Sequence, residues 1–263
     1  MKGRAYTFFK GTKIAIYTWH GCTLEVEGQT ANEPYIAQGP AMTFYINIHG
    51  LLEQMRNDAV QLGDRGPVVL VAGQTDVGKT TLVKILLNYA VRRQRTPLMI
   101  DLDVGQNAIC VPGTIGLNSI ELPADPETGF SVIAPLVFHF GSVSPSSNLD
   151  LYKLLIKRCG ESMVAKFEAD KKVKYAGAII NTCGWVTGGG YQCLLHAINS
   201  FDPDVILVIE DERRFSSLEK DLKNYNKHFH RVLVPKSGGV VVRNKTARAE
   251  SRDAKIREYF YGS

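Results

Sequence analysis

The chain has 263 residues, a mass of 29.1 kDa, 44% hydrophobic residues and a formal net charge of +5, which suits one well-packed core with a smaller attached unit. It has no run of about 18 apolar residues, as a membrane-spanning helix needs, and its N-terminus lacks the apolar core of a secretory signal. Five widely spaced cysteines with no C-x-x-C pair suggest neither a disulfide framework nor a zinc site. We therefore expect an intracellular, soluble protein with no membrane partner.

The first 49 residues alternate apolar and polar side chains in short runs, at residues 13–19, 22–27 and 43–48. Period-two alternation predicts strands, and therefore a small N-terminal antiparallel β domain over residues 1–49. Because so few short strands bury little surface, we expect this unit to dock on the rest of the chain or to belong to a larger sheet. The helical spacing of apolar residues from Leu51 to Leu62 predicts a helical linker over residues 50–66.

From residue 67 onward, apolar runs of strand length alternate with helical stretches. This pattern is typical of an α/β fold in which helices cover both faces of a parallel sheet, and we assign it to residues 67–263. The predicted strands cover residues 68–72, 98–102, 132–138, 175–181 and 205–210, with 232–234 as a sixth candidate. The predicted helices cover residues 79–93, 149–158 and 191–200, and a basic helix follows a loop near the end.

A phosphate-binding loop is predicted directly after the first of these strands, because residues 73–81 match G-x-x-x-x-G-K-[ST] between a strand and a helix. Backbone N–H groups and the helix N-terminus would bind phosphate, Lys79 would add a charge, and Thr80 would bind Mg²⁺. The absence of an [NT]-K-x-D motif disfavours GTP. The predicted ATP-binding residues are Gly73, Gln74, Thr75, Asp76, Val77, Gly78, Lys79, Thr80 and Thr81.

Two acids end the next predicted strand, Asp101 and Asp103. Ligands of parallel α/β sheets lie beyond the carboxyl ends of the strands, so Asp103, the more C-terminal, is the better candidate to reach a transferred phosphoryl group. It would organise the Mg²⁺ shell or accept a proton from the attacking hydroxyl; the alternative is that it caps the following turn. Asp211 and Glu212, after another apolar run, are rival acids.

Basic residues are concentrated near the end of the sequence, after a Gly-Gly pair at residues 238–239. A glycine hinge followed by arginines is typical of a lid that closes over phosphates and stabilises transition-state charge. We call residues 237–257 the lid segment, with Arg243, Arg248 and Arg252 as its catalytic candidates. The alternative is a solvated basic helix face.

Trp185 lies in a glycine-rich loop after another predicted strand. An indole at the ligand edge of the sheet could stack on a nucleic-acid base. The alternative, equally favoured by the residues themselves, is that Trp185 only packs against its own loop.

Several segments together closely resemble the eukaryotic polynucleotide 5′-hydroxyl kinase subunit of the pre-mRNA 3′-end cleavage complex and the tRNA splicing endonuclease complex. They include Thr75-Asp-Val-Gly-Lys-Thr80, Asp103-Val-Gly-Gln106 and Asn181-Thr-Cys-Gly-Trp185. Further matching segments lie at residues 17–22, 52–56, 87–91, 134–137, 235–241 and 256–262. Relative to that family, the N-terminal domain is shortened and the C-terminal domain is absent from this sequence.

The resemblance implies a P-loop fold and transfer of the ATP γ-phosphate, with Mg²⁺, to the 5′-hydroxyl of RNA. It also implies roles for individual residues: Asp103 as base or organiser, Gln106 as a contact to the RNA end, and Trp185 as the residue that stacks on the terminal nucleotide. Lys79, Arg243, Arg248 and Arg252 are the other implied catalytic residues. The implied partners are subunits of the mRNA 3′-end cleavage and tRNA splicing complexes, in the nucleus.

Two other functions are compatible with the same motifs. One is a non-catalytic, ATP-bound scaffold of an RNA-processing complex, and the other is a kinase of a nucleoside or another small hydroxyl compound. The scaffold hypothesis is motivated by the shortened N-terminal domain and the missing C-terminal domain relative to the family.

Overall fold

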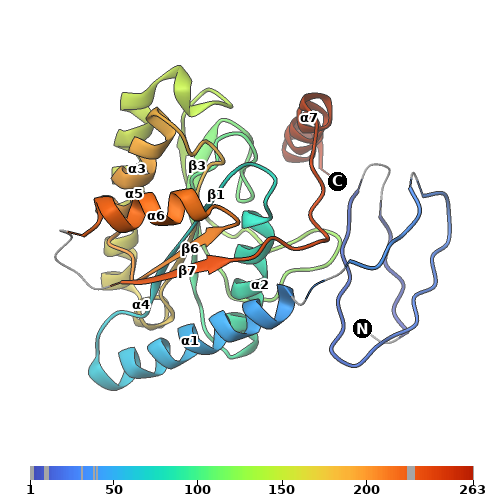
Figure 1. Cartoon of the computed structure of the whole chain (residues 1–263), viewed down its shortest axis with the longest axis horizontal. Helices are drawn as coiled ribbons and strands as arrows, with labels where there is room; N and C mark the ends of the chain where they lie inside the picture. The colour runs from blue at the N-terminus through green and yellow to red at the C-terminus, as the bar shows by residue number, and fades with distance from the viewer. Residues whose placement is uncertain are drawn as a thin grey trace.

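The computed structural model of the chain describes residues 3–8, 12–30, 32–37, 39, 41–223 and 229–262. At its centre is a seven-stranded sheet with the order β4-β3-β2-β5-β1-β6-β7, surrounded by helices (Figure 1). The strands are β1 (Val68–Gly73), β2 (Leu98–Asp101), β3 (Thr114–Ser119), β4 (Leu136–His139), β5 (Ala178–Asn181), β6 (Val205–Ile209) and β7 (His230–Val234). The helices are α1 (Ala41–Leu62), α2 (Lys79–Arg92), the 3₁₀ turn η1 (Pro145–Ser147), α3 (Leu149–Ala169), α4 (Lys171–Ala176), α5 (Gly189–Phe201), α6 (Glu212–Asp221) and α7 (Lys245–Tyr261).

The predicted parallel sheet is confirmed for five neighbouring strands, β2, β5, β1, β6 and β7. The other two, β3 and β4, are antiparallel, and β3 was not predicted. Gly116 and Asn118 weaken its β pattern, because neither residue favours strands. Gly116 has a packing reason: a Cβ there would lie 2.6 Å from the backbone oxygen of Leu136 on β4.

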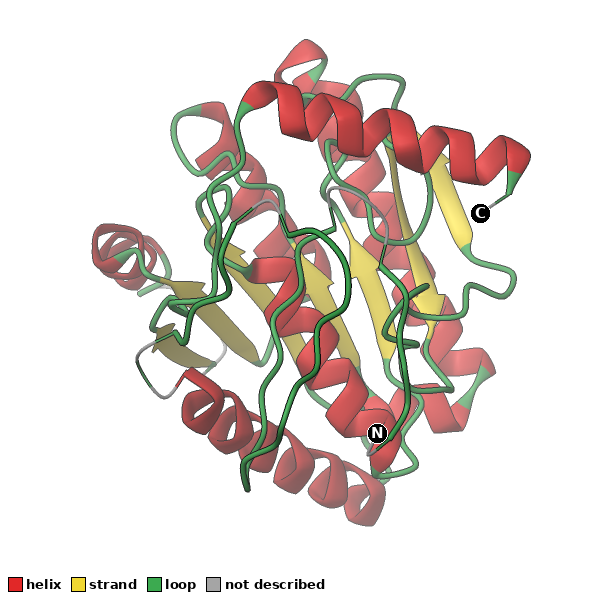
Figure 2. Ribbon diagram, turned by 90° about the vertical axis from the view of Figure 1, so that its right-hand side faces the viewer, coloured by secondary structure: helices red, strands yellow, loops and turns green. Residues whose placement is uncertain are grey.

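Alternate residues of β1 point to opposite faces of the sheet and enter two separate cores. Leu70 and its neighbours pack with α3 and α5 on one face, whereas Val71 and its neighbours pack with α1 and α2 on the other. Figure 2 shows the sheet lying between these helices. The strand is buried along its whole length, as expected for the centre of a sheet covered on both faces. The phosphate-binding loop therefore emerges from a strand that is held firmly on both sides.

The strand predicted at residues 43–48 is wrong, because these residues belong to α1, which begins at Ala41 rather than near Leu51. Tyr45, Ile48 and Leu52 are buried on one face of this helix, and they pack in the core beside α2. The apolar residues at 44, 46 and 48 fit a strand in isolation, but tertiary packing selects the helical spacing instead. The start of the strand predicted at residue 175 is also wrong, since α4 occupies Lys171–Ala176.

The described residues before Ala41 are extended and form no strand or helix of their own. Many of their large apolar side chains, such as Ile16 and Trp19, are about half exposed or more. The strands predicted at residues 13–19 and 22–27 are therefore wrong: these side chains bury little, and short strands without a covered face are marginal. This segment touches the body through Tyr35, whose hydroxyl donates to the backbone oxygen of Gly238 at 3.0 Å.

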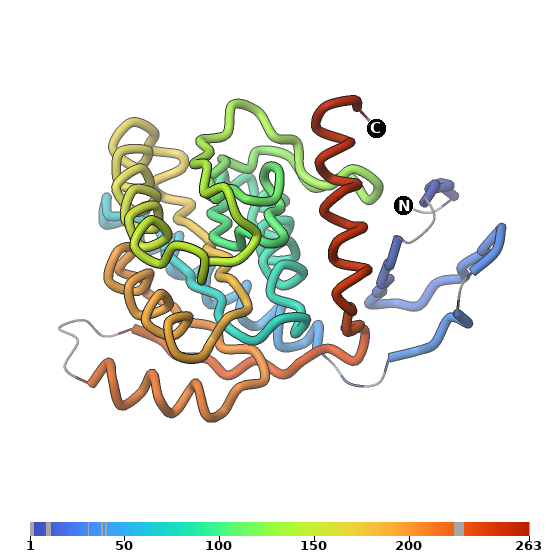
Figure 3. Tube along the Cα trace, turned by 90° about the horizontal axis from the view of Figure 1, so that it is seen from above, coloured from blue at the N-terminus to red at the C-terminus, as the bar shows by residue number. Residues whose placement is uncertain are grey.

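Helix α7 stands at the edge of the body, on the side where the N-terminal segment lies (Figure 3). It confirms the predicted basic helix, and none of its residues is buried. Its N-cap is Asn244, whose side chain accepts a hydrogen bond from the N–H of Ala247 at 2.7 Å. Within the described part of the chain, no helix is both long and apolar enough to span a membrane.

Candidate active site

The phosphate-binding loop turns sharply between β1 and α2. Its backbone has positive φ at Gly73 (+154°), Asp76 (+55°) and Gly78 (+98°), a conformation that glycine adopts freely and that aspartate tolerates better than most residues. Gly78 occupies the N-cap of α2 and offers no side-chain oxygen to the helix. The first N–H groups of α2 are thus left for an anion, and the helix dipole favours negative charge at the same point.

Lys79 begins α2 and is buried, with 6% of its surface exposed. Its Nζ atom donates to the backbone oxygen of Gln74 across the loop at 2.7 Å. Burial lowers the pKa of Lys79, and the charge of the nearby Asp103 carboxylate opposes this shift. The ammonium group is therefore held inside the loop, where phosphate oxygens would bind.

Thr80, Asn181 and Asp101 form a hydrogen-bonded group at the ends of three neighbouring elements. Asn181 Nδ2 donates to Thr80 Oγ1 at 3.3 Å and to Asp101 Oδ1 at 3.0 Å. Asp101 and Asn181 are fully buried, and burial followed by repulsion from Asp103 raises the pKa of Asp101 to about 7. Asn181 Oδ1 is buried and forms no hydrogen bond within the described residues.

Asp103 follows β2 and closes the turn that begins there. Its Oδ1 atom accepts hydrogen bonds from the N–H groups of Gly105 at 2.9 Å and Gln106 at 3.2 Å. The turn-capping role foreseen as an alternative is therefore real, but it uses only one carboxylate oxygen. The turn that it closes is linked to the phosphate-binding loop through Gln106, whose side chain accepts a hydrogen bond from Arg243, which in turn binds Asp76 of the loop.

The lid segment contacts the phosphate-binding loop at Asp76. The N–H of Arg243 donates to Asp76 Oδ2 at 2.9 Å, Arg243 Nε donates to Oδ1 at 3.1 Å, and an Nη of Arg248 donates to Oδ2 at 2.8 Å. Burial works to raise the pKa of Asp76, but these bonds outweigh it and hold the pKa below its usual range. Arg243 also donates from an Nη atom to Gln106 Oε1, at 3.0 Å.

Arg252, the third predicted lid arginine, is not brought to this cluster. It lies further along α7, is partly exposed, and has no hydrogen bond or ion pair with the phosphate-binding loop among the described residues. Its catalytic role stays a prediction, whereas Arg243 and Arg248 are placed beside the loop.

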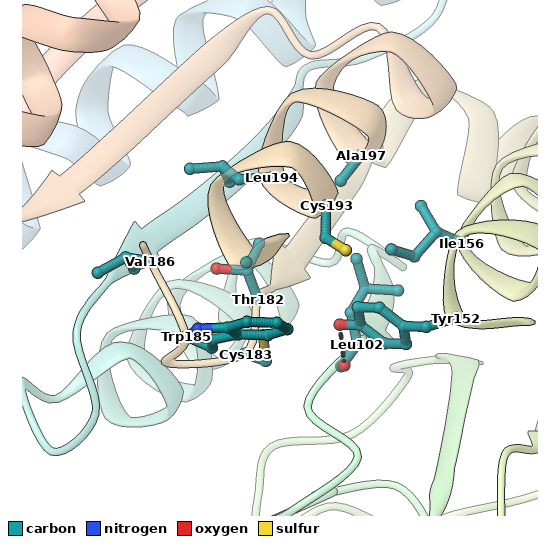
Figure 4. A pocket seen from close by; sticks show the side chains of 11 residues that line it. Leu102, Tyr152, Ile156, Thr182, Cys183, Trp185, Val186, Cys193, Leu194 and Ala197 are labelled. Atoms are coloured by element: carbon teal, nitrogen blue, oxygen red, sulfur yellow. Dashed lines mark hydrogen bonds between the residues drawn. The ribbon is translucent and has the colours of Figure 1, made fainter. Parts of the chain in front are cut away.

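Trp185 is partly buried just before α5 and lines a small cavity of about 10 Å³. Figure 4 shows its indole near Tyr152, whose hydroxyl donates to the backbone oxygen of Leu102 at 2.7 Å. A Cβ on Gly189 would approach the Trp185 ring to 3.0 Å, so the ring packs closely on the first turn of α5. This is the packing role foreseen as an alternative, and stacking on a nucleotide stays a prediction.

The rival acids after β6 have other roles. Asp211 Oδ1 accepts a hydrogen bond from the N–H of Arg214 at 2.8 Å and is the N-cap of α6. Glu212 is an exposed residue in the first turn of the same helix, where an acid is favoured by the helix dipole. These observations favour Asp103 as the site acid.

Asp101 and Asn181 are the site residues that sequence reasoning did not select. The signal was present: each is the last residue of a buried run, and the two are directly paired in the register of β2 and β5. That pairing places both side chains at the same point of the sheet edge, but it is visible only once the strand order is known.

Comparisons with known proteins identify the family and the fold. The family model of the mRNA cleavage and polyadenylation factor CLP1 P-loop matches residues 73–262, and the model of the N-terminal β-sandwich domain of the polyadenylation factor matches residues 1–59. The second match supports the predicted N-terminal β domain, although no strand forms in the described residues before Ala41. The predicted P-loop α/β fold is confirmed.

Among curated proteins, the human polyribonucleotide 5′-hydroxyl-kinase Clp1 is 48% identical over 99% of this chain and 60% of its own length. The zebrafish (Danio rerio) protein of the same name is 50% identical over 99% of this chain and 58% of its length. A solved Clp1p–Pcf11p complex aligns with a TM-score of 0.73 and 26% identity, over 84% of this chain and 54% of that chain. The chain thus spans about three fifths of the length of the curated relatives that it matches.

Proposed function

The chain belongs to the family of the mRNA cleavage and polyadenylation factor CLP1, and on that premise we propose that it transfers the γ-phosphoryl group of ATP to the 5′-hydroxyl end of RNA. The observation that carries the proposal is that Lys79 and two arginines of the lid segment meet at one phosphate-binding loop, and that Arg243 also binds Gln106, in the turn that Asp103 closes. Relatives named polyribonucleotide 5′-hydroxyl kinases support the choice of acceptor.

In the proposed reaction, the loop N–H groups and the N-terminus of α2 bind the β- and γ-phosphates. Lys79, Arg243 and Arg248 neutralise the charge that spreads over the transferred group and the departing ADP. Phosphoryl transfer depends mainly on such positioning and charge stabilisation. The buried ammonium of Lys79 is effective here because it needs little reorganisation.

Asp103 accepts the proton of the attacking hydroxyl. A bond forms between the 5′-oxygen and the γ-phosphorus, the bond from that phosphorus to the β–γ bridging oxygen breaks, and ADP leaves with the electron pair. The proton passes to Asp103 Oδ2, the carboxylate oxygen that has no hydrogen bond among the described residues, while Oδ1 is held by the turn. The turn thus fixes the direction in which the base points.

Residues suited to Mg²⁺ are present around Thr80. Asn181 Oδ1 is an unpaired buried acceptor beside the Thr80 hydroxyl and the Asp101 carboxylate, which is the oxygen-only environment that this ion prefers. In the described ranges, no three His, Cys, Asp or Glu side chains form a metal site by themselves. When bound, Mg²⁺ would neutralise phosphate charge.

We also propose Gln106 and Trp185 as contacts to the RNA end, and the nucleus as the place of action. The solved relative is a Clp1p–Pcf11p complex, which supports subunits of the mRNA 3′-end cleavage machinery as partners. The tRNA splicing complex is the second proposed partner, and it rests on the family resemblance.

A transfer assay tests the proposed activity. Protein is incubated with Mg²⁺, γ-labelled ATP and a 5′-hydroxyl RNA oligonucleotide, and label on the RNA is measured. We expect label with the native chain and a loss of at least about 100-fold with Lys79→Ala. Unlabelled short RNA should compete, whereas free nucleosides should not. Competition by nucleosides would instead favour the small-molecule kinase.

A second candidate is the non-catalytic, ATP-bound scaffold, favoured by the relatives solved with Pcf11p, one of them a study of ATP loss in a point mutant. It predicts ATP binding by calorimetry with no transfer, and partner capture that survives Asp103→Ala. Transfer that depends on Asp103 would reject it.

A further inference from the structure

Asp76 is an acid inside a loop built to bind polyphosphate. It occupies one of the four variable positions of the loop motif, and 3% of its side chain is exposed. A buried carboxylate beside phosphate oxygens opposes their binding unless its charge is balanced. We therefore expect Asp76 to have positively charged partners that balance its charge.

The contacts of Asp76 identify that role. Every hydrogen bond that its carboxylate accepts within the described chain comes from residues 167 and 172 positions away in the sequence, Arg243 and Arg248. Arg243 approaches with both its backbone N–H and its side chain, and both arginines form ion pairs with the carboxylate. Asp76 thus ties the phosphate-binding loop to the first turn of α7 and the residues before it.

The single carboxylate of Asp76 pairs with two guanidinium groups, so the cluster of Asp76, Arg243 and Arg248 has a net positive charge. Neither arginine uses all its donors on Asp76: Arg243 also donates to Gln106 Oε1 at 3.0 Å, and Arg248 Nε is buried with no hydrogen-bond partner among the described residues. Since a guanidinium has five N–H donors, each arginine can contact Asp76 and a phosphate at the same time.

We propose that Asp76 is a positioning residue, which holds Arg243 and Arg248 over the phosphate-binding loop so that they meet the transferred phosphoryl group. This deepens the proposed function and, for its catalytic part, rests on it. Asp76 differs here from its neighbours in the loop, which would contact ATP directly. Its effect on the reaction passes through the two arginines.

A purely conformational role for Asp76 predicts different behaviour. Its backbone is in the left-handed region, with φ +55°, and asparagine adopts this conformation about as readily as aspartate. Asp76→Asn therefore keeps the loop shape and the size of the side chain but removes the charge. It separates the positioning role from the conformational one.

The first experiment needs no kinase activity. Trypsin must insert the side chain of Arg243 or Arg248 into its own acidic pocket, so pairing with Asp76 protects the peptide bonds after these residues. Because hydrogen bonds to charged groups are worth more than neutral ones, we expect Asp76→Asn to be cleaved there at least about tenfold faster. Asp76→Glu, which keeps the charge, should retain more protection.

The matched control is Glu258→Gln, which removes an exposed acid of α7 that pairs with Lys255 and not with the loop. It should leave cleavage after Arg243 and Arg248 unchanged. Equal cleavage of the native chain and Asp76→Asn would overturn the proposal. If Asp76→Asn proves unfolded by circular dichroism, Asp76→Gly provides the decisive measurement, since glycine adopts the same positive φ without a carboxylate, and this variant should be cleaved faster after Arg243 and Arg248.

The second experiment uses the transfer assay in a double-mutant cycle. Asp76→Asn should lower kcat by about tenfold or more without raising KM for ATP. Its effect should be smaller once Arg248 is Gln, because one of the two arginine contacts of Asp76 is then already lost. With Arg252→Gln the effects should add. A raised KM with unchanged kcat, or additive losses with Arg248→Gln, would contradict positioning.

The two experiments distinguish failure of the proposed kinase function from failure of the positioning role of Asp76. If the native chain transfers no phosphate, the proposed function fails, and the proteolysis result still decides whether Asp76 holds the arginines. If transfer occurs but Asp76→Asn leaves proteolysis and kcat unchanged, only the positioning role is lost.

Discussion

Gly184 lies directly against Thr75 of the phosphate-binding loop: a Cβ on Gly184 would come within 2.7 Å of both Thr75 Cα and Thr75 N. The loop after β5 thus supports the backbone of the phosphate site. Only a residue without a side chain permits this approach.

Gly184→Ala should therefore push the two loops apart and weaken both ATP binding and phosphate transfer, by about tenfold or more, since small displacements of positioned groups are costly. Calorimetry with Mg-ATP and the transfer assay measure the two effects. Gly50→Ala is the matched control, because nothing lies within 4 Å of a Cβ there; in the interior of α1 it should add about 0.5–1 kcal/mol of stability. Normal ATP binding by Gly184→Ala would show that the contact is dispensable.

Asp103→Asn should lower kcat by about 100-fold or more, in the range expected for loss of a general base, while changing ATP affinity little. Asn keeps the oxygen that accepts from Gly105 and Gln106, so the turn should survive. The control is Asp211→Asn, which keeps the N-cap of α6 because asparagine caps as well as aspartate, and should leave activity intact. If Asp211→Asn were the inactive variant, the acids would have been assigned in the wrong order.

Asn181→Ala should raise the Mg²⁺ concentration required for half-maximal transfer, because Asn181 bridges Thr80 and Asp101. Stability should also fall by about 1–3 kcal/mol, as a buried carboxylate loses a donor. Asn118→Ala removes another buried asparagine, whose Nδ2 donates to the Ser131 backbone oxygen at 3.2 Å, far from the phosphate-binding loop in sequence. It should cost stability with no change in Mg²⁺ dependence, and an equal shift in both variants would refute the assignment.

His49, on α1, should make the fold sensitive to mild acid. Burial, followed by the charge of Arg56, lowers the pKa of His49 from its ordinary 6.5. Well above pH 6.5 the residue is neutral in both the folded and the unfolded state, and it does not affect stability. As the pH falls below 6.5, the unfolded chain takes up the proton first, so stability decreases towards the folded-state pKa.

His49→Gln removes this penalty but loses the stacking of His49 on Tyr89, whose rings are 5.0 Å apart. The variant should thus be less stable at about pH 7.5 and should approach or exceed the native chain at about pH 5.5. Thermal unfolding at several pH values measures the gap, with the exposed His230→Gln as control. A gap that does not vary with pH would rule out this role of His49.

Some corrections to the sequence interpretation share one cause. Residues 43–48 alternate as a strand would, and Thr114–Ser119 contains residues that disfavour strands, yet the first segment is helical and the second is a strand. In both segments local preference is outweighed by burial: Tyr45, Ile48 and Leu52 cover α2, while Gly116 lets β4 approach closely. Local pattern is a weak guide where the choice depends on a partner surface.

The sequence by itself determined the phosphate-binding loop, since its glycines, Lys79 and Thr80 are adjacent and their spacing alone sets the backbone path. It also placed Asp103 at the end of a strand and a basic helix near the C-terminus. Only the tertiary structure decided that Asn181 joins Thr80 to Asp101, that Asp211 is a helix cap, and that Asp76 pairs with arginines 167 and 172 residues away. Such contacts depend on strand order and packing, which bring together residues that no local pattern relates.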